Sequence, residues 1–368
     1  MVDEWLGRWR KHPAALGVGL ALITIALIAL PFVLTQQFGT TWVRITNFAI
    51  LYIFLALGLN IVVGFAGLLD LGYIAFYAVG AYVYALLASP QFDIHWPFWA
   101  ILPLGAAVAG IFGILLGAPT LKLRGDYLAI VTLGFGEIVR IFLNNLDHPV
   151  NITNGPRGIA RIDPVRIDGV GFGRSDTVLG LVFTGPIKYY YLLLVMVMLV
   201  IFVNVRLQNS RIGRAWEAIR EDEVAARAMG INTRDMKLLA FAMGASFGGI
   251  AGGMFSAIQT FVSPESFVLV ESIMVLSMVV LGGMGNICTG CTVILGAVLL
   301  SFVPEIMRFT VQPVQERLFG RMLIEPEVIR MLVLGFALVL VMILRPGGLW
   351  PSAVRRRELA ARSGEGGP

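Results

Sequence analysis

Long runs of apolar residues alternate with short polar stretches along most of this chain. About ten such runs can be recognised, and most come near the roughly 20 residues that a helix needs to cross a hydrocarbon core of about 30 Å. They span residues 14–34, 42–62, 67–88, 97–118, 127–145, 189–206, 237–258, 268–285, 289–306 and 328–344. The pattern predicts an all-α fold, a polytopic transmembrane helical bundle with about ten membrane segments, of which 67–88 and 268–285 could instead be re-entrant.

Composition agrees with a membrane location. Hydrophobic residues make up 57% of the sequence and charged residues only 14%, which is too little charge to cover the surface of a soluble domain of this size. The net charge of +5 could attract nucleic acid, but the arginines cluster beside apolar runs, which is typical of membrane orientation signals. We therefore expect membrane lipid around the chain and no nucleic-acid partner.

The distribution of Lys and Arg predicts the orientation. With ten crossings and a cytoplasmic N-terminus, the loops 35–41 and 89–96 lie outside, and they contain no Lys or Arg. Both termini are then cytoplasmic. The predicted organisation is an N-terminal tail (1–13), a transmembrane domain (14–350) with a cytoplasmic loop at 207–236 and an outside loop at 146–188, and a C-terminal tail (351–368).

Motifs for nucleotide binding and for zinc-dependent hydrolysis are missing from the sequence. None of the four lysines follows a glycine, so the phosphate-binding pattern G-x-x-x-x-G-K-[ST] cannot occur. H-E-x-x-H does not occur, and the single G-x-S-x-G match, Gly244–Gly248, lies inside the apolar run 237–258. Cys288 and Cys291 form one C-x-x-C pair, which we interpret as inert because it stands alone beside only three histidines. We expect no catalytic, cofactor or metal site in this chain, and no enzymatic activity.

Ionisable residues and glycine clusters within the apolar runs are candidates for a translocation path. Charged groups in lipid are costly and often functional, and helix breaks expose backbone groups that can bind a zwitterion. Glu137 and Arg140 are three residues apart and could pair on a helix; a proton relay is the alternative, which would suit an ion-coupled secondary transporter. The glycines of Val62–Gly72 and Val279–Gly285 could equally serve close helix packing. The candidate path residues are Gly64, Gly67, Asp70, Glu137, Gly282, Gly283 and Gly285.

One charged segment, Arg214–Ile231, interrupts the apolar pattern. If it is helical, an alanine-rich face lies opposite a face of mixed charges, and Gly230 is well placed to end the helix in a left-handed cap. Lipid head groups would favour an excess of Lys and Arg, so the mixed charges do not indicate membrane binding. A solvated helix between two spans is one interpretation; a helix that docks into a groove on a partner protein is the other.

The run GRAWEAIREDEVAARAMGI (Gly213–Ile231) resembles the cytoplasmic coupling loop of ABC-importer permeases, whose signature is E-A-A-x-x-x-G. Ala225, Ala226 and Gly230 match, whereas Val224 occupies the glutamate position and Glu223 precedes it. Further strings are similar to the LivM-type subunits of branched-chain amino-acid importers: Gly58–Tyr82, LRGDYLAIVTLGFGEIVR (Leu123–Arg140), NITNGPRGI (Asn151–Ile159), TFVSPESF (Thr260–Phe267) and VVLGGMGN (Val279–Asn286). The resemblance runs from about residue 40 to Pro351.

The resemblance implies a multi-pass permease subunit in a bacterial inner membrane that imports leucine, isoleucine and valine. Its partners would be a second homologous permease, two cytoplasmic ATPases that bind the ATP and Mg²⁺, and a periplasmic amino-acid-binding protein that docks on loop 146–188. Expected contacts with the ATPases are Glu217, Arg220, Glu223, Ala225, Ala226 and Gly230. Importers of urea or short amides are near relatives and remain the alternative.

Overall fold

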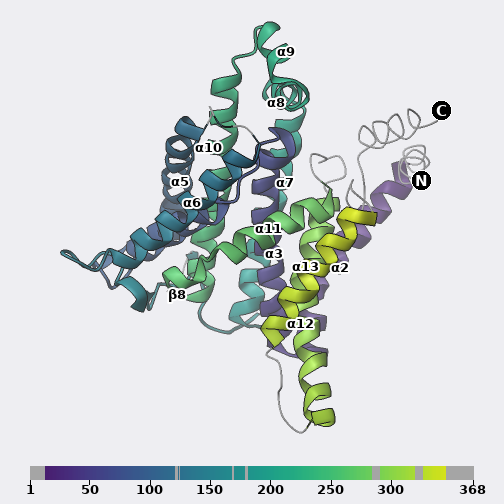
Figure 1. Cartoon of the computed structure of the whole chain (residues 1–368). Coiled ribbons are helices and arrows are strands. Elements are labelled where there is room, and N and C mark those ends of the chain that lie inside the picture. Colours follow the sequence, from purple (N-terminus) through teal and green to yellow (C-terminus); the bar gives the residue numbers. More distant parts are fainter. Residues whose placement is uncertain are drawn as a thin grey trace.

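Helices form almost the whole of the computed structural model, which describes residues 13–120, 123, 125–167, 170–178, 181–283, 291–319 and 326–344 (Figure 1). The long helices are α2 (Pro13–Phe38), α3 (Thr40–Asn60), α4 (Tyr73–Leu87), α5 (Phe98–Thr120), α6 (Asp126–Asn145), α7 (Gly185–Gln208), α10 (Thr233–Gln259), α11 (Leu269–Gly282), α12 (Cys291–Phe319) and α13 (Pro326–Leu344). Each of the ten predicted segments coincides with one of them.

Six helical segments of the described chain are long and apolar enough to cross a membrane, so the protein is a multi-pass membrane protein. They are Thr40–Phe65, Phe98–Thr120, Gly185–Gln208, Thr233–Gln259, Pro264–Gly282 and Thr292–Thr310, and Tyr73–Leu87 is a shorter apolar helix. The count of ten crossings stays a prediction. The tails 1–12 and 345–368 lie outside the described residues, and so does the predicted location of both termini.

The third predicted segment, 67–88, differs from a simple span. α3 continues into a π-helix, η1 (Ile61–Phe65), and the chain then leaves helical geometry until α4 starts at Tyr73. Gly67 has a φ of +68°, which favours glycine over residues with a side chain. Backbone irregularity at membrane depth is tolerated only where protein buries it, and most of residues 61–72 are buried.

The centre of the bundle is α10, which packs closely against α4 and α5. A Cβ added to Gly249 would lie 2.7 Å from the carbonyl oxygen of Gly105 and 2.6 Å from the Cβ of Ala109, both on α5. On the α4 side, a Cβ on Gly80 would overlap the backbone of Gly249 itself. Small residues therefore bring three helices together, as is common in membrane proteins, where close van der Waals packing drives association.

The predicted helical fold is confirmed, and short strands occur in the connections between the helices. Four antiparallel pairs occur among the described residues: β1 (Ala88–Ser89) with β2 (Ile94–His95), β3 (Ile159–Ala160) with β8 (Phe261–Val262), β4 (Arg166–Ile167) with β5 (Val170–Gly171), and β6 (Asp176–Val178) with β7 (Leu181–Phe183). The strands are too short to carry an alternating hydrophobic pattern, which is why periodicity misses them.

The β3–β8 pair joins loop 146–188 to the connection between α10 and α11. Ile159 lies opposite Val262, and both are buried. Two single turns accompany the pair, η2 (Gly155–Arg157) and η3 (Pro264–Ser266). β8 directly follows α10, whereas the short helices α8 (Arg211–Glu221) and α9 (Glu223–Ala228) precede α10 and project at the top of Figure 1.

Candidate functional site

The charged segment folds as a compact unit on the ends of α7 and α10. Ser210 caps α8, because its Oγ accepts a hydrogen bond from the backbone N–H of Gly213 at 3.2 Å. α8 buries Trp216 and Ile219, and the indole Nε1 of Trp216 donates to the carbonyl oxygen of Met236 at 2.7 Å. Trp216 is fully buried, so α8 is anchored to the start of α10.

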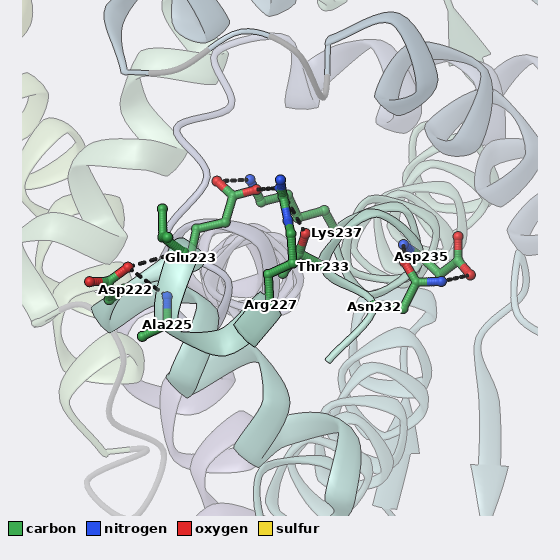
Figure 2. Close-up of polar contacts among 9 residues, drawn as sticks. Asp222, Glu223, Ala225, Arg227, Asn232, Thr233, Asp235 and Lys237 are labelled. Atoms are coloured by element: carbon green, nitrogen blue, oxygen red, sulfur yellow. Dashed lines mark hydrogen bonds and ion pairs between the residues drawn. The ribbon is translucent and has the colours of Figure 1, made fainter. Parts of the chain in front are cut away.

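Asp222 splits the segment into two helices, which corrects the prediction of a single helix over Arg214–Ile231. Its backbone is extended, with φ −152° and ψ 109°. Its Oδ1 accepts from the backbone N–H groups of Val224 (2.8 Å) and Ala225 (3.0 Å), as Figure 2 shows. The hydrogen bonds from Ala225 and Val224 lower the pKa of this carboxyl group. Asp222 is thus the N-cap of α9, a role that its position between two charged residues did not reveal.

Glu223 holds α9 against the first turns of α10. One carboxylate oxygen lies 2.8 Å from Nζ of Lys237 and the other lies 3.1 Å from a guanidinium nitrogen of Arg227 (Figure 2). The Lys237 side chain is only 8% exposed, whereas that of Arg227 is 65% exposed. Arg227 also donates to Oγ1 of Thr233 at 3.3 Å. The side chain of Glu223 therefore points into the protein rather than toward a partner.

Gly230 ends α9 as predicted. Its φ of +84° is left-handed, and the backbone N–H of Ile231 donates to the carbonyl oxygen of Ala226 at 3.1 Å. No atom lies within 4 Å of a Cβ built on Gly230, so backbone conformation alone selects glycine there. The prediction of a left-handed cap is confirmed.

Arg220 connects α8 to the irregular end of α3. Its Nη1 donates to the carbonyl oxygen of Gly64, in η1, at 2.6 Å. A Cβ on Gly67 would lie 2.8 Å from Cγ of Arg220, so the missing side chain of Gly67 makes room for the arginine. Arg220 is one of the expected ATPase contacts, and Gly64 and Gly67 are candidate residues of the translocation path. The two groups of residues therefore touch at this contact.

The remaining candidates on α8 and α9 divide between the interior and the surface. Ala226 is 3% exposed, while Glu217 and Ala225 are exposed. Two large apolar side chains, Val224 (68% exposed) and Met229 (83% exposed), stand out on the surface of this charged unit. Val224 was not among the expected ATPase contacts, because it occupies the position of the signature glutamate.

Of the other candidate path residues, Asp70 lies in the same irregular segment as Gly64 and Gly67, whereas Glu137 and Gly282 belong to other helices. Asp70 is buried in the break, where its Oδ1 accepts from the backbone N–H of Gly72 at 2.9 Å. Glu137, on α6, pairs with Arg140 at 3.0 Å, which confirms the predicted pairing. Gly282 packs on α12, where a Cβ would lie 2.5 Å from the carbonyl oxygen of Thr292.

Gly283, with φ +111°, follows the end of α11, and Gly285 lies outside the described residues. Cys288 and the side chain of Cys291 also lie outside the described part of the chain. Within the described part of the chain, no group of three His, Cys, Asp or Glu residues could hold a metal ion.

The fold is that of a multi-pass membrane protein, a bundle of apolar helices with a charged helical unit at one end. Residues 41–342 match the family described as branched-chain amino acid transport system / permease component. The high-affinity branched-chain amino acid transport permease LivM of Salmonella typhimurium is 45% identical over 94% of this chain and 77% of its own length. LivM of Escherichia coli is 44% identical over 94% and 76%.

The chain therefore belongs to this branched-chain amino acid permease family. LivH of Salmonella typhimurium, named as a permease of the same transport system, is 26% identical over 64% of this chain and 76% of its own. No solved structure gives a significant match.

Proposed function

We propose that this chain is one of two permease subunits of an ATP-driven importer that carries branched-chain amino acids across a bacterial inner membrane. LivM and LivH are both named as permeases for these amino acids, and this chain is similar to each, which supports a heteromeric permease pair. ATP and Mg²⁺ would bind to separate cytoplasmic ATPases, and a periplasmic protein would deliver the amino acid. In this assembly, α8 and α9 form the contact with the ATPases.

The exposed apolar side chains of α9 carry this proposal. Val224 and Met229 lie on a unit rich in charges, at the end of the molecule that the orientation prediction places in the cytoplasm. Such residues become buried when a protein partner covers them. We assign the ATPase contact to Glu217, Val224, Ala225 and Met229, which are exposed, and a positioning role to Glu223, Ala226 and Gly230.

Arg220 would transmit movement of α8 into the membrane. Its guanidinium is bonded to the carbonyl oxygen of Gly64, so a shift of α8 pulls on the end of α3 where regular helix geometry is already lost. π-helical turns are frequent at functional sites. In this scheme Gly64, Gly67 and Asp70 form the part of the path that responds to ATP hydrolysis.

The contact is tested by introducing a charge into the apolar surface. Met229→Asp and Val224→Asp should reduce co-purification of the two ATPases with the permease pair, because a carboxylate would be buried in the interface. Val150→Asp is the matched control, since Val150 is 62% exposed but belongs to loop 146–188. Undiminished co-purification of both α9 variants would contradict the assignment.

The link through Arg220 is tested separately. Arg220→Gln should lower the number of amino acids transported per ATP hydrolysed in proteoliposomes, with ATPase binding retained. Arg214→Gln provides the control, because Arg214 on the same helix also donates to a backbone oxygen, but to that of nearby Asn209 at 3.0 Å. Equal transport ratios for the two variants would refute the link.

The substrate class is tested with the complete complex and its binding protein. ATP-dependent uptake of leucine, isoleucine and valine, with no uptake of urea, is the expected result. Uptake of urea or acetamide in place of leucine would establish the alternative substrate. Leucine uptake driven by an ion gradient without ATP would establish a secondary transporter.

A further inference from the structure

A cavity of about 530 Å³ lies at the end of the bundle opposite α8 and α9. It is formed by the start of α3, the start of α7, the end of α10 and the loop that carries β4 and β5. α7 ends and α10 begins beside the charged unit, and α3 continues into η1, where Arg220 contacts Gly64. The other ends of these three helices, which form the cavity, therefore lie on the periplasmic side if the proposed function holds. The following inference rests on that function.

The wall of the cavity contains two buried polar atoms that have no partner among the described residues. Asn47 is 1% exposed; its Nδ2 donates to the carbonyl oxygen of Pro186 at 2.9 Å, but its Oδ1 receives no hydrogen bond. Oγ1 of Thr184 is likewise buried and unpaired. Thr184 occupies the N-cap position of α7, and its side chain makes no capping hydrogen bond. Buried polar atoms are almost always hydrogen-bonded in proteins, so two without a partner at one cavity are unusual.

A positive charge borders the same cavity. Arg44 lines it, is exposed, and forms no ion pair with any residue in the described part of the chain. A guanidinium group matches the geometry of a carboxylate through two parallel hydrogen bonds. α3 and α7 also begin here, and the unpaired N–H groups at a helix start favour negative charge. The described lining includes no acidic residue that would compete for Arg44.

The lining also includes Thr40, Ser175 and Thr260 and a group of apolar side chains, which suits an aliphatic side chain. Phe172 and Tyr189 pack edge to face with ring centroids 5.3 Å apart, and Ile258 comes from the last turn of α10. An apolar pocket with a few convergent polar groups is the usual form of a small-molecule site. The cavity thus offers a cation, neutral oxygen acceptors and an apolar surface within one volume.

We propose that this cavity is a binding site for an aliphatic α-amino acid on its way into the membrane. Arg44 binds the α-carboxylate, Oδ1 of Asn47 and Oγ1 of Thr184 accept hydrogen bonds from the α-ammonium group, and Phe172, Tyr189 and Ile258 contact the side chain. The amino acid occupies this site when the periplasmic protein releases it, so the permease itself selects for an intact α-amino acid head group.

The test measures ligand binding to the complete permease–ATPase complex in lipid nanodiscs, without the periplasmic protein and without ATP. Leucine is compared with leucinol, which lacks the carboxylate, and with 4-methylpentanoate, which lacks the ammonium group. Arg44→Gln should weaken leucine binding by about tenfold or more and leave leucinol binding unchanged, because one charge-assisted interaction is lost. Arg166→Gln, an exposed arginine of β4, is the matched control and should bind both ligands as the native protein does.

A second variant tests the ammonium partners without removing an existing hydrogen bond. Thr184→Ala should weaken leucine but not 4-methylpentanoate, since Oγ1 of Thr184 has no partner within the described protein. Equal leucine affinity in the native protein and both variants, or no leucine binding to the native complex, would overturn the site. Leucine uptake by the native complex is measured in parallel. If ATP-driven uptake is normal and Arg44→Gln does not change leucine binding, only this site is refuted. If the native complex does not take up leucine, the proposed function is refuted.

Discussion

The ion pair between Glu223 and Lys237 allows a quantitative prediction about the attachment of α9. Lys237 is 8% exposed on its side chain, Glu223 is 21% exposed, and their charged atoms lie 2.8 Å apart. Removing one partner of a buried pair costs about 3–5 kcal/mol, because the other charge is left without compensation. The partial exposure of Glu223 favours the lower end of this range. The additional pair with Arg227 is solvent-exposed, and such i,i+4 pairs contribute only about 0.3–0.5 kcal/mol.

Glu223→Ala should therefore weaken the attachment of α9 to α10 by about 3 kcal/mol, which corresponds to roughly a hundredfold change in the equilibrium between attached and detached α9. Hydrogen exchange followed by mass spectrometry over residues 222–232 would show faster exchange in the variant. ATPase activity coupled to leucine uptake should fall with it, because α9 would no longer be held in one orientation.

Two further variants separate the buried charge from other effects. Glu223→Ala combined with Lys237→Met removes both charges and should restore most of the protection, since no unpaired charge is left. Arg227→Gln should change protection by less than a few-fold, in line with its exposed position. If the double variant is as unprotected as Glu223→Ala, or if Glu223→Ala exchanges like the native protein, the buried-pair explanation is wrong.

Two other predictions concern the ends of α9. Gly230→Val should destabilise the cap by about 1–2 kcal/mol, because the φ of +84° at this position is left-handed. Leucine uptake should fall, while ligand binding by the periplasmic protein stays the same. Gly230→Asn should retain most uptake, since asparagine tolerates this conformation, and equal uptake by the two variants would contradict a conformational role. Asp222 has a lowered pKa, so its capping contribution to stability is present above the ordinary value of 3.8 and is lost as the pH falls below it. At such low pH, hydrogen exchange at the amides of Val224 and Ala225 should accelerate in the native protein relative to Asp222→Asn, whose side-chain amide oxygen caps the helix without titrating. Parallel pH profiles of exchange in the two proteins would refute the cap.

Features that depend on neighbours in the sequence were predictable. The apolar runs indicated the helices because a membrane span is recognised from length and composition alone, and the spacing of Glu137 and Arg140 placed them on one helix face. Gly230 could be interpreted as a cap since its position after the charged helix favours a left-handed residue. Asp222 was the local failure: a charged residue between charged residues does not reveal that its carboxylate folds back on Val224 and Ala225.

Features that join distant parts of the chain required the tertiary structure. Glu223 was expected to face a partner, but packing of α9 on α10 turns it toward Lys237. The contact of Arg220 with Gly64 spans 156 positions in the sequence, and no periodicity could pair the two residues. The cavity beside Arg44 exists only because the ends of three helices and a loop meet. Local dihedral preference and hydrophobicity thus determine which segments become helices, whereas the choice of partners among them depends on how side chains of distant segments fit together.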